Sequence, residues 1–286
     1  MLYVELTIQG LIYGSMYALM AVGLTLVYGL LRILHIAHAA LYTLGAYIAV
    51  LITNATGSLA LGAAVSALTV GIAGMVVYRL LYEPLLARPP HVALIASIGL
   101  LIVLEEAYRI VFGPYGETFA TAQLTERVTI GPIGVKAAEL AMVATAVVLL
   151  SALALFATRT RTGIAWRATV SDPAMARSFG VDTIRVRYLN FFLASLLAAA
   201  AGTLVAVLNN LVEPTMGAVP SYKSLAIIVL GGLGNVGGTL VAALALGVIE
   251  AFGTIYLGQI LDRDAIAFLF LVGVLMVRPR GLFAPR

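Results

Sequence analysis

Long apolar runs, almost unbroken by charge, constrain this chain more than any other feature. Two of them cover 140–156 and 188–208. A helix rises ~1.5 Å per residue, so about 20 apolar residues cross a hydrocarbon layer ~30 Å thick. Strands of a membrane barrel would instead alternate apolar and polar residues over ~10 positions. With 62% hydrophobic and 10% charged residues among 286, the composition excludes a water-soluble domain, and we predict an all-α polytopic transmembrane bundle.

The apolar segments predict eight or nine membrane crossings. The run 221–233 is short for a full crossing and is also compatible with a half-helix that enters the membrane and turns back. Residues 1–286 are expected to form a single transmembrane domain with two longer polar loops, 113–137 and 158–187. Within the first loop, 128–133 is typical of a small β-hairpin or cap on the membrane surface. The apolar segments are 6–29, 36–53, 59–82, 92–112, 138–157, 188–212, 221–233, 239–258 and 265–277.

Basic residues predict the orientation, because lysine and arginine are retained on the cytoplasmic side. Most of the 17 basic residues then face inward with the loop 158–187 and the C-terminus, while the N-terminus and 113–137 lie outside. Lys223 and Arg263 fall on the outer side. Since the positive charge is explained by topology, we expect no nucleic acid partner. The arginines of the inner loop are Arg159, Arg161, Arg167, Arg177, Arg185 and Arg187.

Catalytic and metal-binding patterns are sparse. The chain has no cysteine, hence no thiolate metal site and no catalytic thiol. It also lacks G-x-x-x-x-G-K-[ST], so it does not bind ATP through a P-loop. His35 and His38 have no third ligand at metal spacing and are expected to be interfacial or packed histidines. We therefore expect no enzyme activity, no metal and no cofactor in this chain. Glu250 is the acid expected within a span, and an intramembrane carboxylate is a candidate proton or ion site.

Two places interrupt apolar helices next to polar residues. One precedes the helix that carries Tyr42, and the other is the glycine-rich stretch 231–238. Irregular backbone at membrane depth is tolerated only where it is buried in protein or lines a water-filled path. A tight loop at the cytoplasmic surface would also explain the glycines. The candidate residues of a translocation path are His35, His38, Tyr42, Gly231, Gly234 and Asn235.

The loop 158–187 contains a short helix with both of its ends marked. Asp172 is a helix N-cap followed by proline at the first helical position, and Gly180 stands where glycine ends helices. Met175, Ala176 and Phe179 would form a small apolar face suited to a groove on a partner, or else to the lipid headgroups. The residues assigned to this contact are Asp172, Pro173, Met175, Ala176, Phe179 and Gly180.

Small residues recur at four-residue spacing on three of the expected helices. Such faces let helices approach closely in lipid, and we expect them to pack inside one subunit rather than between subunits. They are Gly10/Gly14/Ala18, Ala194/Ala198/Gly202 and Ala243/Gly247/Ala251.

Four stretches resemble the LivH-type permeases of the branched-chain amino acid and amide ABC importers. They are 23–38, the pattern Ala176-x-x-x-Gly180-Val181, the run 227–235 and the tail 278–283. The chain departs from the family at His35-Ile36-Ala37-His38-Ala39, where the family often has asparagine before Phe-Ala-His-Gly.

The resemblance implies a permease subunit of an ATP-driven importer for branched-chain or other amino acids, or small amides, in a bacterial inner membrane. The implied partners are a homologous second permease, two cytoplasmic ATPase subunits that bind ATP-Mg, an extracytoplasmic substrate-binding protein and membrane lipid. The segment 172–181 would then dock on an ATPase subunit. The alternative is a secondary transporter or channel that works without ATPase subunits, with Glu250 as its ion site.

Overall fold

The computed structural model describes residues 2–130, 133–278 and 281–283. Pro279, Arg280 and 284–286, which belong to the predicted cytoplasmic tail, lie outside the described residues. The helices are α1 (Leu2–Leu31), α2 (His38–Thr56), α3 (Leu59–Val77), α4 (Pro90–Phe112), α5 (Ala137–Arg159), α6 (Arg161–Ser171), α7 (Pro173–Ser178), α8 (Thr183–Asn209), α9 (Ala218–Gly231), α10 (Val236–Leu257) and α11 (Arg263–Val277).

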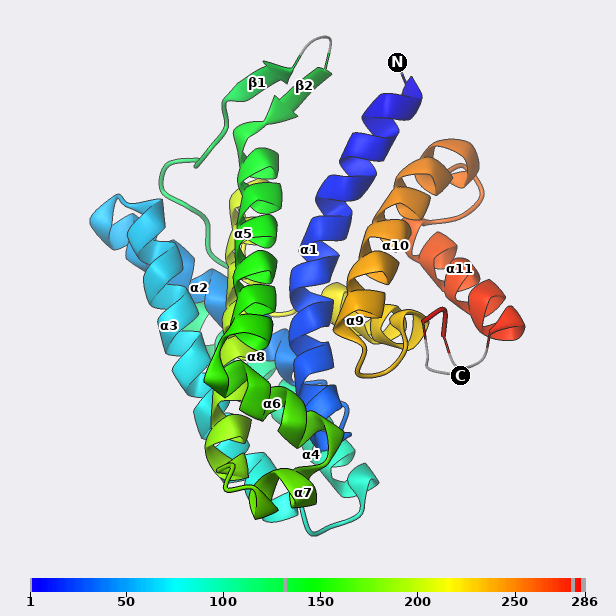
Figure 1. The fold of residues 1–286 in the computed structure, drawn as a ribbon. Coiled ribbons are helices and arrows are strands. Elements are labelled where there is room, and N and C mark those ends of the chain that lie inside the picture. The colour runs from blue at the N-terminus through cyan, green and yellow to red at the C-terminus, as the bar shows by residue number, and fades with distance from the viewer. Residues whose placement is uncertain (1, 131–132, 279–280, 284–286) are drawn as a thin grey trace.

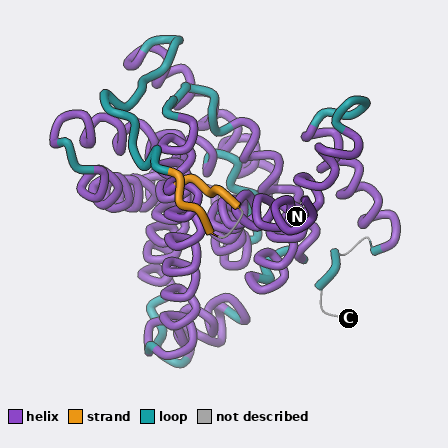
Figure 2. The backbone as a smooth tube through the Cα atoms, turned by 90° about the horizontal axis from the view of Figure 1, so that it is seen from above, coloured by secondary structure: helices purple, strands orange, loops and turns teal. Residues whose placement is uncertain are grey.

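The long helices run roughly along one axis and separate two ends of the molecule. The N-terminus of α1 and a β-hairpin lie at one end, and α6 and α7 lie at the other (Figure 1). The hairpin pairs β1 (Arg127–Ile130) with β2 (Ile133–Lys136) in antiparallel register, as the sequence predicted. Seen from above, its strands lie over the helices (Figure 2).

The number of membrane crossings predicted from the sequence is not confirmed. Within the described residues, six helices are long and apolar enough to cross a membrane by length and composition, against eight or nine predicted segments. Helix α9 has 14 residues and α11 has 15, lengths of only ~21–23 Å at 1.5 Å per residue. Helix α4 is long, but its last third carries Glu105, Glu106 and Arg109. The six candidate spans are 2–31, 38–56, 59–85, 137–159, 183–209 and 236–257.

Two of the small-residue faces bring α1 and α10 together, as predicted for packing within one subunit. A Cβ atom added at Gly10 would lie 2.5 Å from the Cα of Val248, and one added at Gly14 would lie 2.8 Å from the Cα of Leu244. Neither position has room for a side chain. The third face packs α8 against α2, where Gly202 touches the backbone of Tyr42.

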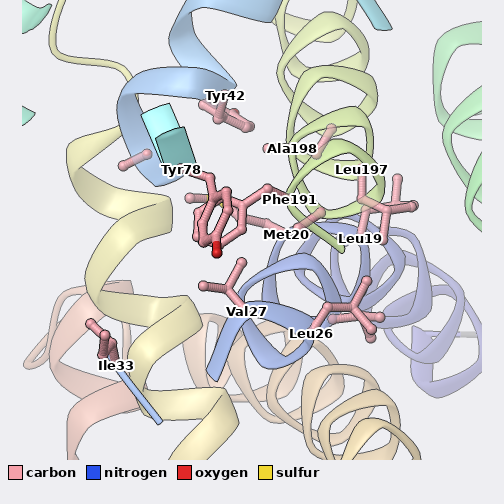
Figure 3. Close-up of a cluster of buried hydrophobic side chains, with 14 of the residues drawn as sticks. Leu19, Met20, Leu26, Val27, Ile33, Tyr42, Tyr78, Phe191, Leu197 and Ala198 are labelled. Atoms are coloured by element: carbon pink, nitrogen blue, oxygen red, sulfur yellow. The ribbon is translucent and has the colours of Figure 1, made fainter. Parts of the chain in front are cut away.

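Aromatic side chains fill the core where α3 ends. A π-helical turn, η1 (Tyr78–Tyr82), and a short 3-10 turn, η2 (Glu83–Leu85), follow α3. The buried rings of Tyr78 and Tyr82 pack against Phe191 of α8, with centroids 5.0 and 5.4 Å away. Figure 3 shows Tyr78 and Phe191 among aliphatic side chains of α1 and α8. This packing holds Tyr82 beside the break between α1 and α2.

Candidate coupling surface and translocation path

Helix α7 forms as its sequence signals predict. Asp172 is the N-cap, and its Oδ1 accepts hydrogen bonds of 2.9 Å from the backbone N–H groups of Ala174 and Met175. Pro173 is the first helical residue. After the helix, Gly180 adopts φ +82°, a conformation that favours glycine. The cap, the proline and the glycine therefore act together to present one short turn of helix at the α6–α7 end of the molecule (Figure 1).

The apolar face of α7 is narrower than predicted. Phe179 is 81% exposed and Met175 is 56% exposed. Ala176 is buried instead, and its carbonyl accepts the N–H of Val181 at 3.1 Å. Successive helical residues lie about 100° apart, so Ala176 turns inward when Met175 faces out. The contact surface offered by α7 is thus Met175 with Phe179.

The two predicted histidines of the path are buried in protein. His35 Nδ1 is 2.6 Å from the hydroxyl of Tyr82, which donates to Ser97 Oγ at 2.8 Å. The backbone N–H of Ala37 donates to the same Ser97 oxygen at 3.0 Å. His38, at the start of α2, lies against Gly23, where a Cβ atom would come within 2.8 Å of its Nε2. Side chains of η1 and α4 therefore hold His35 and the N–H of Ala37 in the break between α1 and α2.

The glycine-rich segment forms the turn between α9 and α10, and part of it lines a cavity of about 760 Å³. Asn235 is the N-cap of α10: its Oδ1 accepts from the N–H of Gly238, and its Nδ2 donates to the carbonyl of Phe283, both at 3.0 Å. Gly234 and Asn235 line the cavity together with Trp166 of α6. Gly231 does not line it, because it packs against Gly238 and Thr239.

A second cavity, of about 430 Å³, lies toward the hairpin end and includes Tyr42. Its wall contains residues of α1, α2, α8, α9 and α11 and of the connection between α8 and α9. That connection is tied to the loop before the hairpin, because Glu117 and Val212 exchange two backbone hydrogen bonds of 2.9 and 2.8 Å. The two cavities thus lie toward opposite ends of the helix bundle, one beside α6 and one beside the hairpin loop.

A buried ion cluster joins four helices beside the second cavity. Glu250 of α10 accepts from Tyr17 of α1 at 2.7 Å, pairs with Lys223 of α9 at 2.9 Å and pairs with Arg263 of α11 at 2.9 Å. Lys223 also pairs with Asp264 at 2.9 Å. Glu250 is 0% and Lys223 is 3% exposed. The cluster therefore contains two cations and two anions, all held by partners.

Glu250 lies within α10 and is fully buried, as the sequence predicted, but it is paired with Lys223 and Arg263 rather than isolated. Lys223 lies within α9 and is also buried. A charged residue inside an apolar helix requires a partner, and this rule could have pointed from Lys223 to Glu250. Asp264 and Tyr17 carried no such signal.

No group of three or more histidine, cysteine, aspartate or glutamate side chains that could hold a metal occurs in the described part of the chain. Six apolar helices of spanning length define the class as a polytopic membrane protein, with a cavity toward each end of the bundle.

The sequence model described as "Branched-chain amino acid transport system / permease component" matches residues 6–278. The chain belongs to this family, as the resemblance indicated, and is a permease subunit of an ABC importer.

Curated relatives cover nearly the whole chain. It is 30% identical to the high-affinity branched-chain amino acid transport system permease protein LivH of Escherichia coli, over 98% of this chain and 95% of that protein. It is 29% identical to BraD of Pseudomonas aeruginosa with the same coverage. A shorter match, 31% identical over 42% of this chain, is to the permease protein LivM of Salmonella typhimurium. No solved structure matches the chain significantly.

Proposed function

We propose that this subunit carries amino acids, branched-chain amino acids first among them, across a bacterial inner membrane and receives its driving motion through α7. The observation that carries the proposal is the exposed pair Met175 and Phe179 on a capped helix at the end opposite the hairpin. An apolar face on a short helix fits a groove on a partner protein. The printed names of the relatives support the substrate class.

The partner on α7 is a cytoplasmic ATPase subunit. Two such subunits bind and hydrolyse ATP-Mg, and their closure moves the segment 172–181. Asp172 and Pro173 keep the helix formed, Met175 and Phe179 enter the groove, and Ala176, Gly180 and Val181 hold the turn that follows. The arginines around α7 add positive charge to this contact.

A second, homologous permease completes the membrane part, and a substrate-binding protein delivers the amino acid from outside. The match to LivM, itself a transport system permease protein, supports a heteromeric pair. In this assembly the loop 158–187 and the C-terminus are cytoplasmic, and 113–137 and the N-terminus are extracytoplasmic.

The translocation path runs between the two cavities. Tyr42 belongs to the outer cavity, and Gly234 and Asn235 belong to the inner one. His35, His38 and Gly231 flank the path, where they support the breaks between α1 and α2 and between α9 and α10. The subunit exchanges between a conformation open at the outer cavity and one open at the inner cavity, and this exchange gives alternating access.

Reconstitution tests the proposal. The chain and its second permease are placed in liposomes. The ATPase subunits are enclosed in the liposomes or added to them, in either case with ATP. The binding protein is loaded with labelled L-leucine. We expect uptake that depends on ATP and on every subunit. Leucine uptake by this chain alone, without ATPase subunits, would instead establish a secondary transporter and contradict the proposal.

A further inference from the structure

The outer cavity combines an apolar wall with a few polar groups. Its apolar part includes Val205, Leu208 and Met216, and its polar part includes Tyr42, Glu213 and Arg263. A volume of about 430 Å³ falls within the ~300–1,000 Å³ typical of small-molecule sites, which are mostly apolar with a few polar groups that fix orientation. The cavity therefore has the size and composition of a site for one small amphipathic molecule.

Tyr42 is the first sign of a ligand. Its side chain is fully buried and lines the cavity, and its hydroxyl has no hydrogen-bond partner among the described residues. Buried hydroxyl groups are nearly always paired, because an unpaired one loses its hydration without compensation. A bound polar group in the cavity would supply the missing partner.

Arg263 is the second sign. Its Nε pairs with Glu250 at 2.9 Å, and its guanidinium carbon lies 4.0 Å from the ring centroid of Tyr13. These two contacts fix the plane of the guanidinium. Among the described contacts of its side chain, the ion pair uses Nε alone, which leaves the two terminal nitrogens for an acceptor at the cavity. A guanidinium held in this way suits the two oxygens of a carboxylate.

The wall of the cavity presents groups of both charges. Lys223 and Arg263 balance Glu250 and Asp264 through ion pairs, and the exposed carboxylate of Glu213 adds one negative charge to the same wall. An ammonium group complements Glu213, and a carboxylate complements the terminal nitrogens of Arg263. A zwitterion supplies both groups.

We propose that this cavity is a binding subsite for a zwitterionic amino acid with an apolar side chain. Arg263 receives the α-carboxylate, Tyr42 donates its hydroxyl to the same group, and Glu213 receives the α-ammonium. The aliphatic side chain lies against Val205, Leu208 and Met216. The identity of the ligand rests on the proposed function, whereas the location of the site rests on the geometry.

Protection from thiol labelling tests the site in the complete transporter complex. The chain has no cysteine, so Met216→Cys introduces a single reporter in the cavity wall. L-Leucine should slow the reaction of this cysteine with a maleimide. The residues around the cysteine determine the leucine concentration that gives half-protection. Two analogues should protect poorly: 4-methylpentanoate, which lacks the ammonium, and 3-methylbutylamine, which lacks the carboxylate. Labelling of Ile260→Cys, at a position 83% exposed in the α10–α11 turn, should not respond to leucine.

Matched variants test the assigned contacts. Tyr42→Phe removes one hydroxyl and should raise the leucine concentration for half-protection about tenfold, since a hydrogen bond to a charged group is lost. Arg263→Lys keeps the charge but loses the planar geometry and should have an effect at least as large. Tyr47→Phe is the control, because Tyr47 is on the same helix, is equally buried and has an unpartnered hydroxyl, but it packs against Phe112.

The outcomes separate the site from the function. Absence of protection by leucine in a complex that performs ATP-driven leucine uptake would overturn the site and leave the proposed function intact. Equal effects of Tyr42→Phe and Tyr47→Phe would also overturn it. Protection by leucine without ATP-driven uptake would retain the site and contradict the proposed function.

Discussion

At the scale of single residues, four charged side chains neutralise one another inside the helix bundle. Lys223 forms ion pairs with both Glu250 and Asp264, and Glu250 also forms an ion pair with Arg263. A buried charge without a partner is very unfavourable, while a paired one is tolerated. The cluster therefore links α9, α10 and α11 to α1 through ion pairs and a hydrogen bond.

Lys223→Met should destabilise the protein by about 3–5 kcal/mol, because Glu250 remains buried with less compensation. The double variant Lys223→Met with Glu250→Gln should recover part of this loss. Thermal unfolding of the purified protein measures the loss and the recovery of stability. The signal is the fraction of protein that stays monodisperse after heating. Arg109→Met is the control: it breaks an exposed pair with Glu106, worth ~0–1 kcal/mol. An equal loss in both single variants would contradict the role of the cluster.

Phe179→Asp should separate the ATPase subunits from the permease. If Phe179 enters a groove on the ATPase, the new carboxylate is buried unpaired, at a cost of several kcal/mol, so ATPase co-purification should fall at least tenfold. Insertion into the membrane should not change, because Phe179 is exposed in the subunit itself. Ile260→Asp, at an equally exposed apolar position near the other end, should leave the complex intact. A stable, active complex with Phe179→Asp would exclude docking at α7.

At the scale of elements, helix contacts depend on positions where no side chain fits. Helices α1 and α10 approach through Gly10, Gly14 and Gly247, whose missing side chains leave room for the backbone of the other helix. Such close contact provides most of the attraction between helices in lipid. It also brings Tyr17 of α1 to Glu250 of α10, so the small residues position part of the ion cluster.

Gly14→Leu should therefore destabilise the fold by about 1–3 kcal/mol or more, because overpacking forces the two helices apart. The same substitution at Gly99 of α4 is the control, since no described atom lies within 4 Å of a Cβ added there. Both variants are compared by thermal unfolding in the same detergent. If Gly99→Leu lowers the stability as much as Gly14→Leu does, the destabilisation does not come from the α1–α10 contact.

At the scale of the whole molecule, the two ends of the bundle differ in charge and in shape. One end carries the β-hairpin, and the other carries α6 and α7 with the arginine-rich loop (Figure 1). Basic residues are retained in the cytoplasm during insertion. The difference between the two ends therefore predicts an orientation in which α7 faces the cytoplasm.

Reporter fusions test this orientation. A reporter attached after Arg286 should be active in the cytoplasm, and one inserted near Thr121 should be active on the outer side. Replacing arginines of 158–187 by glutamine should weaken the preference, whereas replacing Arg127 and Lys136 should not. Exchanged signals from the two fusions would reverse the topology and exclude contact between α7 and a cytoplasmic ATPase.

The sequence by itself determined the membrane class, the hairpin and the short α7 helix. Each depends on a local pattern: apolar run length for the helices, turn residues for the hairpin, and Asp172, Pro173 and Gly180 for α7. Such patterns act over a few residues and can be recognised without a fold.

Only the tertiary structure decided the partners of Lys223 and the walls of the cavity around Tyr42. These features arise from contacts between distant segments: Tyr17 and Glu250 are 233 positions apart. The lengths of α9 and α11 also required the structure, because apolar composition does not show where a helix ends. Partners of this kind meet only when the helices pack, which is why no local pattern in the chain predicted them.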